Sequence, residues 1–274
     1  MRNSTPYFLL IITNTFLLGF TLIRKKDSKL FSLFLSMAGL AFLFEYIVLV
    51  LFKSYRYYPK ILKNSYFDNI FGANVSQLYA VPTVAVFWTA YQLKFKWGIL
   101  FTLIFVTIEK IFLKLGIYKH GWWRLWLTGG SIPIFFLITK MWFRLMQQSH
   151  SKFFHIAMLY LNIVTIFLTQ RFYLTAFFHT HYFKTGMLKG AGKDHIVYVT
   201  PYNLIISGLM TSLIWSKNFF IQAIGILFMY VIESQLYKRG ILQISKNWSL
   251  LKFMIVNIST LVLGSAMLKT ISNK

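Results

Sequence analysis

The chain has 274 residues, of which 57% are hydrophobic and only 13% are charged. Soluble domains average roughly 45–50% apolar and about 25% charged residues, so one water-soluble core could not bury this apolar surface. The net charge is +23, which in a soluble protein would suggest nucleic-acid binding. Here the basic residues stand mostly in short runs between apolar stretches, so they predict contact with anionic lipid headgroups and not with nucleic acid. The absence of cysteine excludes disulfides and thiolate chemistry.

Apolar stretches recur along the chain at the length of about 20 residues that a helix needs to cross the hydrocarbon of a bilayer. In chain order they cover roughly residues 7–23, 30–52, 70–92, 97–117, 125–146, 153–177, 202–216, 218–237 and 249–268. The first resembles a signal peptide but has no small-x-small cleavage site, so we expect a retained helix. The seventh and eighth are separated only by Ser216-Lys217-Asn218. They therefore form either a tight helical hairpin or one broken segment. This pattern predicts an all-α, polytopic transmembrane helical bundle of eight or nine spans, forming one domain over residues 1–274.

Two connections are longer than the others, from Lys53 to Asn69 and from His179 to Pro201. Both are aromatic and basic, and we expect partly ordered interfacial segments in them. Lys and Arg are divided almost evenly between the two sets of loops, so the positive-inside rule assigns no orientation.

An internal repeat is suggested by residues 108–117 and 232–241, which are identical at five of ten positions. Val81-Pro82 and Thr200-Pro201 would each open the span before the matching segment. We therefore expect two four-helix units, residues 30–146 and 153–268, related by an axis along the membrane normal. The alternative is a chance similarity between apolar, lysine-rich segments.

The acidic residues are divided by position. Each glutamate lies inside a predicted span, and each aspartate lies in a predicted loop: Glu45, Glu109 and Glu233, against Asp27, Asp68 and Asp194. An ionised carboxylate at the middle of a membrane costs at least ~2.5 kcal/mol, so each glutamate should face the protein interior or a water-filled cavity. The glutamates then either form a proton, cation or amine site or connect helices structurally. Asp68 and Asp194 would lie at the mouth of such a path.

Other polar residues support weaker predictions. His179, His181 and His195 with Asp194 are types that can bind a metal, but their spacing fits no established site. His120 beside Trp122-Trp123 is expected at the membrane interface. Interhelical hydrogen bonds are expected from polar residues in the sixth and ninth spans, among them Gln170, Asn257, Ser259 and Thr260. No catalytic motif or phosphate-binding loop is present, and no cofactor is expected.

The chain resembles an uncharacterised family of integral membrane proteins from Gram-positive spore-forming bacteria over about residues 40–145. The resemblance rests on Phe44-Glu45-Tyr46, Tyr58-Pro59, Phe67-Asp68-Asn69-Ile70-Phe71-Gly72, Ser76-Gln77, Val81-Pro82, Ile108-Glu109 and His120-Gly121-Trp122-Trp123. It implies a multi-pass protein of the bacterial cytoplasmic membrane or the spore membrane, and it transfers no catalytic residue.

Three functions are consistent with the sequence. The first is permeation of a small solute or ion along a polar path lined by Glu45, Glu109 and Glu233. The second is a structural or partner-binding membrane subunit without transport or catalysis. The third is an intramembrane enzyme acting on lipid, which nothing in the sequence requires.

Overall fold

The computed structural model describes residues 3–149 and 151–272, and this part of the chain is predominantly helical. Eight helical stretches in it have the length and apolar composition of membrane spans. The predicted all-α, multi-pass bundle of eight or nine spans is therefore confirmed. One further long helix, α5 (Phe95–Lys114), carries Lys96, Glu109, Lys110 and Lys114 and is not among the eight. The chain divides into two compact units, unit 1 (Met1–Ser151) and unit 2 (Lys152–Lys274).

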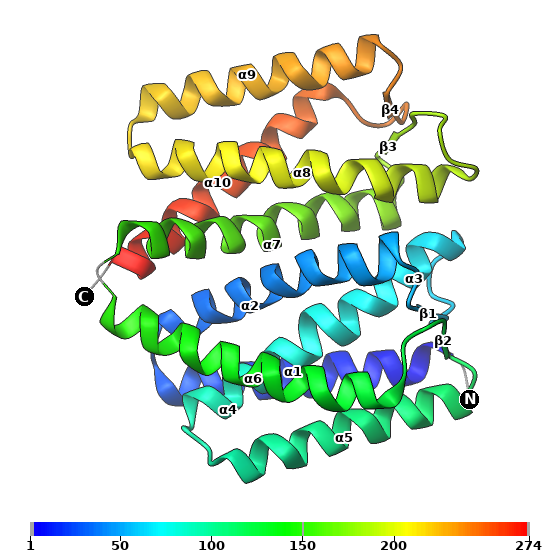
Figure 1. Cartoon of the computed structure of the whole chain (residues 1–274). Coiled ribbons are helices and arrows are strands. Elements are labelled where there is room, and N and C mark those ends of the chain that lie inside the picture. The colour runs from blue at the N-terminus through cyan, green and yellow to red at the C-terminus, as the bar shows by residue number, and fades with distance from the viewer. Residues whose placement is uncertain (1–2, 150, 273–274) are drawn as a thin grey trace. The chain divides into compact units, whose positions relative to one another are not determined.

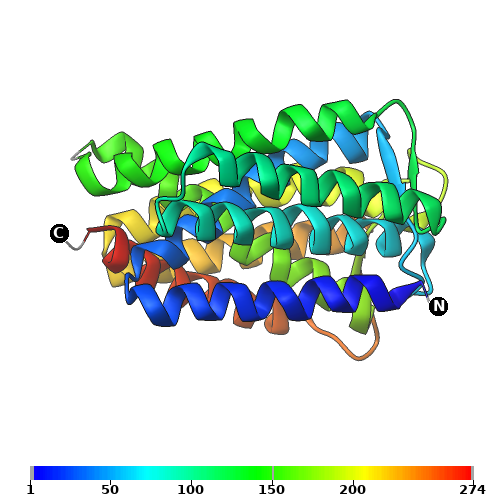
Figure 2. The same cartoon turned by 90° about the horizontal axis from the view of Figure 1, so that it is seen from below.

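Unit 1 combines long helices with a two-stranded ribbon (Figure 1). The helices are α1 (Ser4–Lys25), α2 (Lys29–Glu45) continued by the π-helix η1 (Tyr46–Leu51), α3 (Ser65–Ala73) continued by η2 (Asn74–Ala80) and α4 (Val81–Ala90), α5, and α6 (Leu125–Gln148). Strands β1 (Tyr55–Tyr57) and β2 (Tyr118–His120) pair in antiparallel register. Both views place the N-terminus and this ribbon at the same end of the unit 1 helices (Figures 1 and 2).

Unit 2 has the same order of elements without a counterpart of α1 (Figure 1). The elements are α7 (Lys152–Phe178), β3 (His181–Phe183), α8 (Ala191–Ser216), α9 (Phe219–Lys238), β4 (Leu242–Ile244) and α10 (Leu250–Ser272). Strands β3 and β4 pair in antiparallel register. Lys217 adopts a left-handed conformation, and the Asn218 side chain accepts hydrogen bonds from the first turn of α9. Residues 216–218 therefore form the turn of a tight helical hairpin and not a break within one segment.

The two long connections are shorter than predicted, because helices begin inside them. The α3 helix begins at Ser65, where the Asn64 side chain accepts hydrogen bonds from the N–H groups of Tyr66 and Phe67. The α8 helix begins at Ala191. The prediction that Asp68 and Asp194 lie in loops is therefore wrong: each is in the first turn of a helix, where a negative charge is favoured by the helix dipole.

The prolines do not open the spans as predicted. Pro201 is inside α8, and Pro82 is at the start of α4 but within the helical stretch that runs on from α3 through η2. A proline within a helical stretch removes one backbone donor, and neighbouring helices in a membrane bundle allow this. Proline position is therefore no guide to where these two spans begin.

The two aspartates hold equivalent loops in their units. The carboxylate of Asp68 accepts backbone N–H groups from the segment after β1, at 2.8–2.9 Å from Lys60, Ile61 and Leu62. The carboxylate of Asp194 does the same for the segment after β3, at 2.6–3.3 Å from Thr185, Gly186 and Leu188. Each loop is thereby tied to the helix that follows it.

The residue after each aspartate ties the same helix to a strand. The Asn69 side chain accepts the N–H of Tyr57 at 2.7 Å, and Nδ1 of His195 accepts the N–H of Phe183 at 2.9 Å. Asp68-Asn69 and Asp194-His195 thus perform matching backbone functions, although the second residue of each pair differs.

Candidate functional site

Glu109 in α5 contacts His120 at the end of β2. Its Oε1 lies 2.7 Å from Nε2 of His120. The backbone beside His120 is anchored because Gly121 donates its N–H to the carbonyl of Ser54 at 2.7 Å. A Cβ at position 121 would lie 2.6 Å from the Lys53 carbonyl, so glycine is needed for this close approach. The sequence predicted an interfacial His120 and missed its contact with Glu109.

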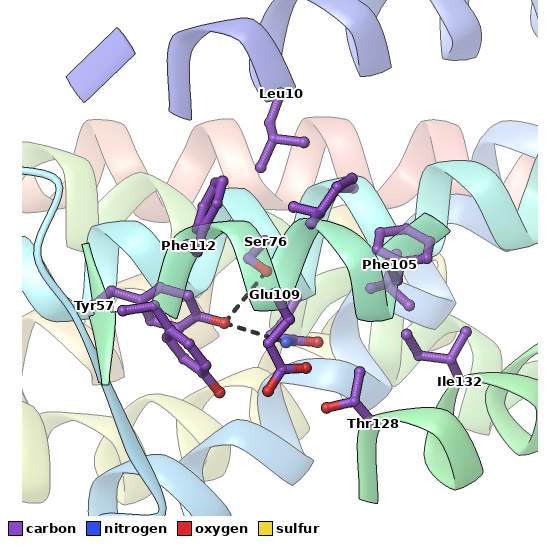
Figure 3. Close-up of a pocket in the computed structure, with 13 residues that line it drawn as sticks. Leu10, Tyr57, Ser76, Phe105, Glu109, Phe112, Thr128 and Ile132 are labelled. Carbon is purple, nitrogen blue, oxygen red and sulfur yellow. Dashed lines mark hydrogen bonds between the residues drawn. The ribbon is translucent and has the colours of Figure 1, made fainter. Parts of the chain in front are cut away.

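A cavity of about 40 Å³ lies beside Glu109 within unit 1 (Figure 3). Its polar wall is formed by Tyr57, Ser76, Gln77, Glu109, Tyr118 and Thr128. Figure 3 shows the Glu109 carboxylate turned into the space near Thr128. A single water needs about 10–15 Å³ of such volume, so the cavity has room for two or three waters. None of the described residues that line it is Lys or Arg.

Tyr57 is the centre of the hydrogen bonding in this cavity. Its hydroxyl donates to Ser76 Oγ and accepts from Gln77 Nε2, each at 3.2 Å. The ring can pack this closely against α3 because residue 72 is glycine. A Cβ on Gly72 would lie 2.4 Å from the Cβ of Tyr57. The local sequence therefore places a phenol at the cavity wall.

Three tyrosines of the ribbon connect two carboxylates. The ring of Tyr118 lies 4.8 Å from that of Tyr57 and 5.5 Å from that of Tyr55, between centroids. Burial, and then the charge of Glu45, raise the pKa of Tyr55 and of Tyr57. Burial, and then the neighbouring Tyr57 and Glu109, raise the pKa of Tyr118. The phenols therefore stay protonated and can donate hydrogen bonds. Tyr55 donates to Glu45, whereas Tyr57 and Tyr118 lie with Glu109 at the cavity wall. We call these two carboxylates and the tyrosines between them the acidic site.

Glu45 is the last residue of α2 and is only 5% exposed. One carboxylate oxygen accepts a hydrogen bond from the hydroxyl of Tyr55. The other oxygen has no hydrogen-bond partner among the described residues. The π-helix η1 follows directly, and the second π-helix, η2, contributes Ser76 and Gln77 to the cavity. Such turns are rare and are found frequently at functional sites.

Glu233 in α9 has a different environment, because it forms a buried ion pair with Arg171 of α7. Both side chains are 1% exposed. The guanidinium also lies 3.4 Å from the Asn257 side-chain oxygen and stacks over the rings of Phe167 and Phe253, at 4.6 and 5.0 Å. This carboxylate is neutralised within unit 2, and its contacts are those of a structural connection between helices.

The acidic site of unit 1 and the ion pair of unit 2 occupy matching positions. Glu109 and Glu233 each precede the second strand of their ribbon by nine residues. Glu45 precedes the first strand of its ribbon by ten residues, and Arg171 precedes β3 by the same ten. The position that carries an acid in unit 1 therefore carries a base in unit 2.

Among the described residues, the aspartates and the loop histidines form no ligand site. Neither Asp68 nor Asp194 lines the cavity, and both bind backbone N–H groups. No group of three His, Asp or Glu side chains in the described part of the chain could hold a metal. His181 is buried, and burial, with its neighbours His195 and Arg171, lowers the pKa of its ring. The structure gives no support to a metal at His179, His181 and His195.

Two sequence predictions about polar residues inside the spans can be compared with the structure. Sequence reasoning missed Arg171, although an arginine in the middle of an apolar run is itself a signal of a buried partner. It predicted interhelical bonds correctly for the side chain of Gln170, which accepts from Ser259 at 3.0 Å and from Thr260 at 3.3 Å. These bonds join α7 to α10.

Comparison with protein-family models, with curated proteins and with solved structures finds no match to this chain. The fold and the site therefore define the class: a multi-pass helical membrane protein with a buried acidic site in unit 1.

Proposed function

We propose that the chain is a membrane permeation protein for a small solute or ion, in which Glu109 takes up and releases protons that cross the membrane. One observation carries this proposal: Glu109 contacts His120 and lines a water-sized cavity inside a bundle of helices. Carboxyl and imidazole groups are the side chains that most often exchange protons near neutral pH.

The contrast between the glutamates supports a functional Glu109. A carboxylate among spanning helices is costly and persists where it is paired or does work. Glu233 is paired with Arg171 and closed off. Glu109 has only the titratable His120 as an ion-pair partner among the described residues, and Glu45 forms no ion pair there.

The size of the cavity limits what the site handles in this conformation. A volume of about 40 Å³ holds waters but no organic solute. Proton exchange through water and hydroxyl groups is compatible with it, whereas passage of anything larger requires the helices to rearrange. In this conformation Glu109 therefore exchanges protons, and a larger solute crosses only in a second conformation.

The test is proton flux into proteoliposomes that contain a pH-sensitive dye, driven by a potassium diffusion potential. We expect wild-type protein to acidify the lumen and Glu109→Gln to reduce the rate at least tenfold. The matched control is Lys114→Gln, which removes an exposed charge from the same helix and should leave the rate unchanged. Circular dichroism establishes that both variants are folded.

The competing function is a structural or partner-binding subunit. The closed ion pair of unit 2 favours it for that half of the chain. Wild-type proteoliposomes with the proton flux of empty liposomes, together with a stoichiometric partner on purification, would reject permeation in favour of this function.

We also propose that units 1 and 2 arose by duplication, with matching strands, aspartate-bound loops and glutamates as support. The copies would then have diverged at Glu45 and Arg171, so that one kept an open acidic site and the other a structural pair. The resemblance over residues 40–145 supports a bacterial cytoplasmic or spore membrane as the location.

A further inference from the structure

A second hollow, of about 560 Å³, opens at the end of unit 1 beside the β1–β2 ribbon. Its walls are polar and basic on the ribbon side and apolar at the end of α5: Asn3, Tyr58, Lys60, Tyr118 and Lys119, with Leu113 and Gly116. No carboxylate is among these residues. The volume lies within the roughly 300–1,000 Å³ of small-ligand sites.

The ribbon beside this hollow contains an unfavourable pair of charges. Arg56 and Lys119 are directly opposite each other in the antiparallel register, and both are exposed. Like charges placed in this way destabilise a strand pair. The matching pair in unit 2, Tyr182 opposite Gln243, carries no charge. The repulsion is therefore a local feature of unit 1 and not a requirement of the ribbon.

Nothing in the described chain neutralises these cations. Arg56, Lys60 and Lys119 form no ion pair with any carboxylate there, and the nearby Asp68 is occupied by backbone N–H groups. The guanidinium of Arg56 lies 5.2 Å from the ring centre of Tyr58, which holds it at the edge of the hollow. A bound anion between these groups would relieve the repulsion.

We propose that this hollow binds the phosphate of an anionic membrane phospholipid, with Lys60 and Lys119 as its direct ligands. Phosphate is the common chemistry of a headgroup and of the free ion, and position favours the headgroup. Asn3 directly precedes α1, which has the length and composition of a span, so the hollow lies at the depth of a membrane surface. Leu113 and the half-exposed Leu115 offer an apolar surface to the acyl chains. This site is independent of proton transfer at Glu109.

Lipid binding is measured by native mass spectrometry on the purified full chain in detergent. The probes are short-chain phosphatidylglycerol, short-chain phosphatidylcholine and inorganic phosphate. We expect wild-type protein to retain phosphatidylglycerol at least tenfold more tightly than the other two. The variant Arg56→Gln/Lys60→Gln/Lys119→Gln should lose this preference. The control removes three exposed charges from unit 2: Lys184→Gln/Lys189→Gln/Lys246→Gln.

Three other results of this binding experiment would contradict the proposal. Equal weakening in the unit 2 control means diffuse attraction to the whole basic protein. Equal affinity for phosphatidylcholine removes the anion preference, and tight binding of inorganic phosphate alone makes the free ion the ligand.

A stability measurement isolates the charge repulsion. Without phosphatidylglycerol, Lys119→Gln should raise the melting temperature, because it removes the charge opposite Arg56. With the lipid present, the variant should gain less stability than wild type. A lowered melting temperature in the lipid-free variant would contradict the repulsion on which the proposal rests.

Discussion

Replacing Arg171 with Met tests the energetics of unit 2 most directly. Arg171 and Glu233 are each 1% exposed, so loss of the cation leaves a carboxylate in the protein interior without its partner. Breaking a buried pair from one side costs about 3–5 kcal/mol in other proteins. The two aromatic contacts of the guanidinium, at 4.6 and 5.0 Å, are lost as well, each worth ~0.5–2 kcal/mol. We therefore expect Arg171→Met to lower the free energy of unfolding by at least about 3–5 kcal/mol.

The double variant Arg171→Met/Glu233→Leu completes the experiment. A buried ion pair replaced by apolar side chains of similar size is often neutral in stability or more stable. We expect the double variant to recover most of the loss, which gives a large coupling energy in the double-mutant cycle. Unfolding in micelles by increasing fractions of sodium dodecyl sulfate, followed by far-UV circular dichroism, measures all four proteins.

The control is Lys269→Met, which removes an exposed cation from α10 of the same unit. A surface change of this kind usually alters stability by less than about 0.5 kcal/mol. The reasoning is refuted if Arg171→Met costs less than about 1 kcal/mol, or if the two single effects simply add in the double variant.

Three further predictions concern other positions. Glu45→Arg should place a cation where unit 2 has Arg171, so it should pair with the acidic site and reduce proton flux in proteoliposomes without unfolding the protein. The buried His181 has a pKa well below its ordinary value of about 6.5, so the unfolded chain binds its proton first. The stability that neutral His181 provides is complete above a pH of about 6.5, the pKa of the unfolded chain, and falls as the pH is lowered, by up to ~1.4 kcal/mol per pH unit. His181→Gln should flatten this pH dependence in unfolding curves between pH 8 and 5. Gly121→Ala should destabilise unit 1 by ~1–3 kcal/mol through overpacking, whereas Gly130→Ala, with open space around it, should be neutral or stabilising in the same assay.

The prediction of helices was correct where an apolar run is long enough to cross the hydrocarbon of a bilayer. The eight apolar spans and the helical position of all three glutamates follow from length and composition, whereas the hairpin at Ser216-Lys217-Asn218 was one of two alternatives that the sequence left open. Prediction failed where a helix begins with polar residues. Asp68 and Asp194 were predicted to lie in loops, because polar side chains of this kind are common both in turns and at helix starts.

The sequence by itself determined that this protein spans a membrane, that its glutamates lie within helices, and that two segments around Glu109 and Glu233 resemble each other. Only the tertiary structure decided which glutamate is paired with a permanent cation and which lines a cavity. Arg171 closes Glu233, whereas Glu109 and Glu45 share the ribbon tyrosines beside a cavity. The physical reason is that the cost of a buried carboxylate is set by its partners, and these come from helices and strands far away along the chain.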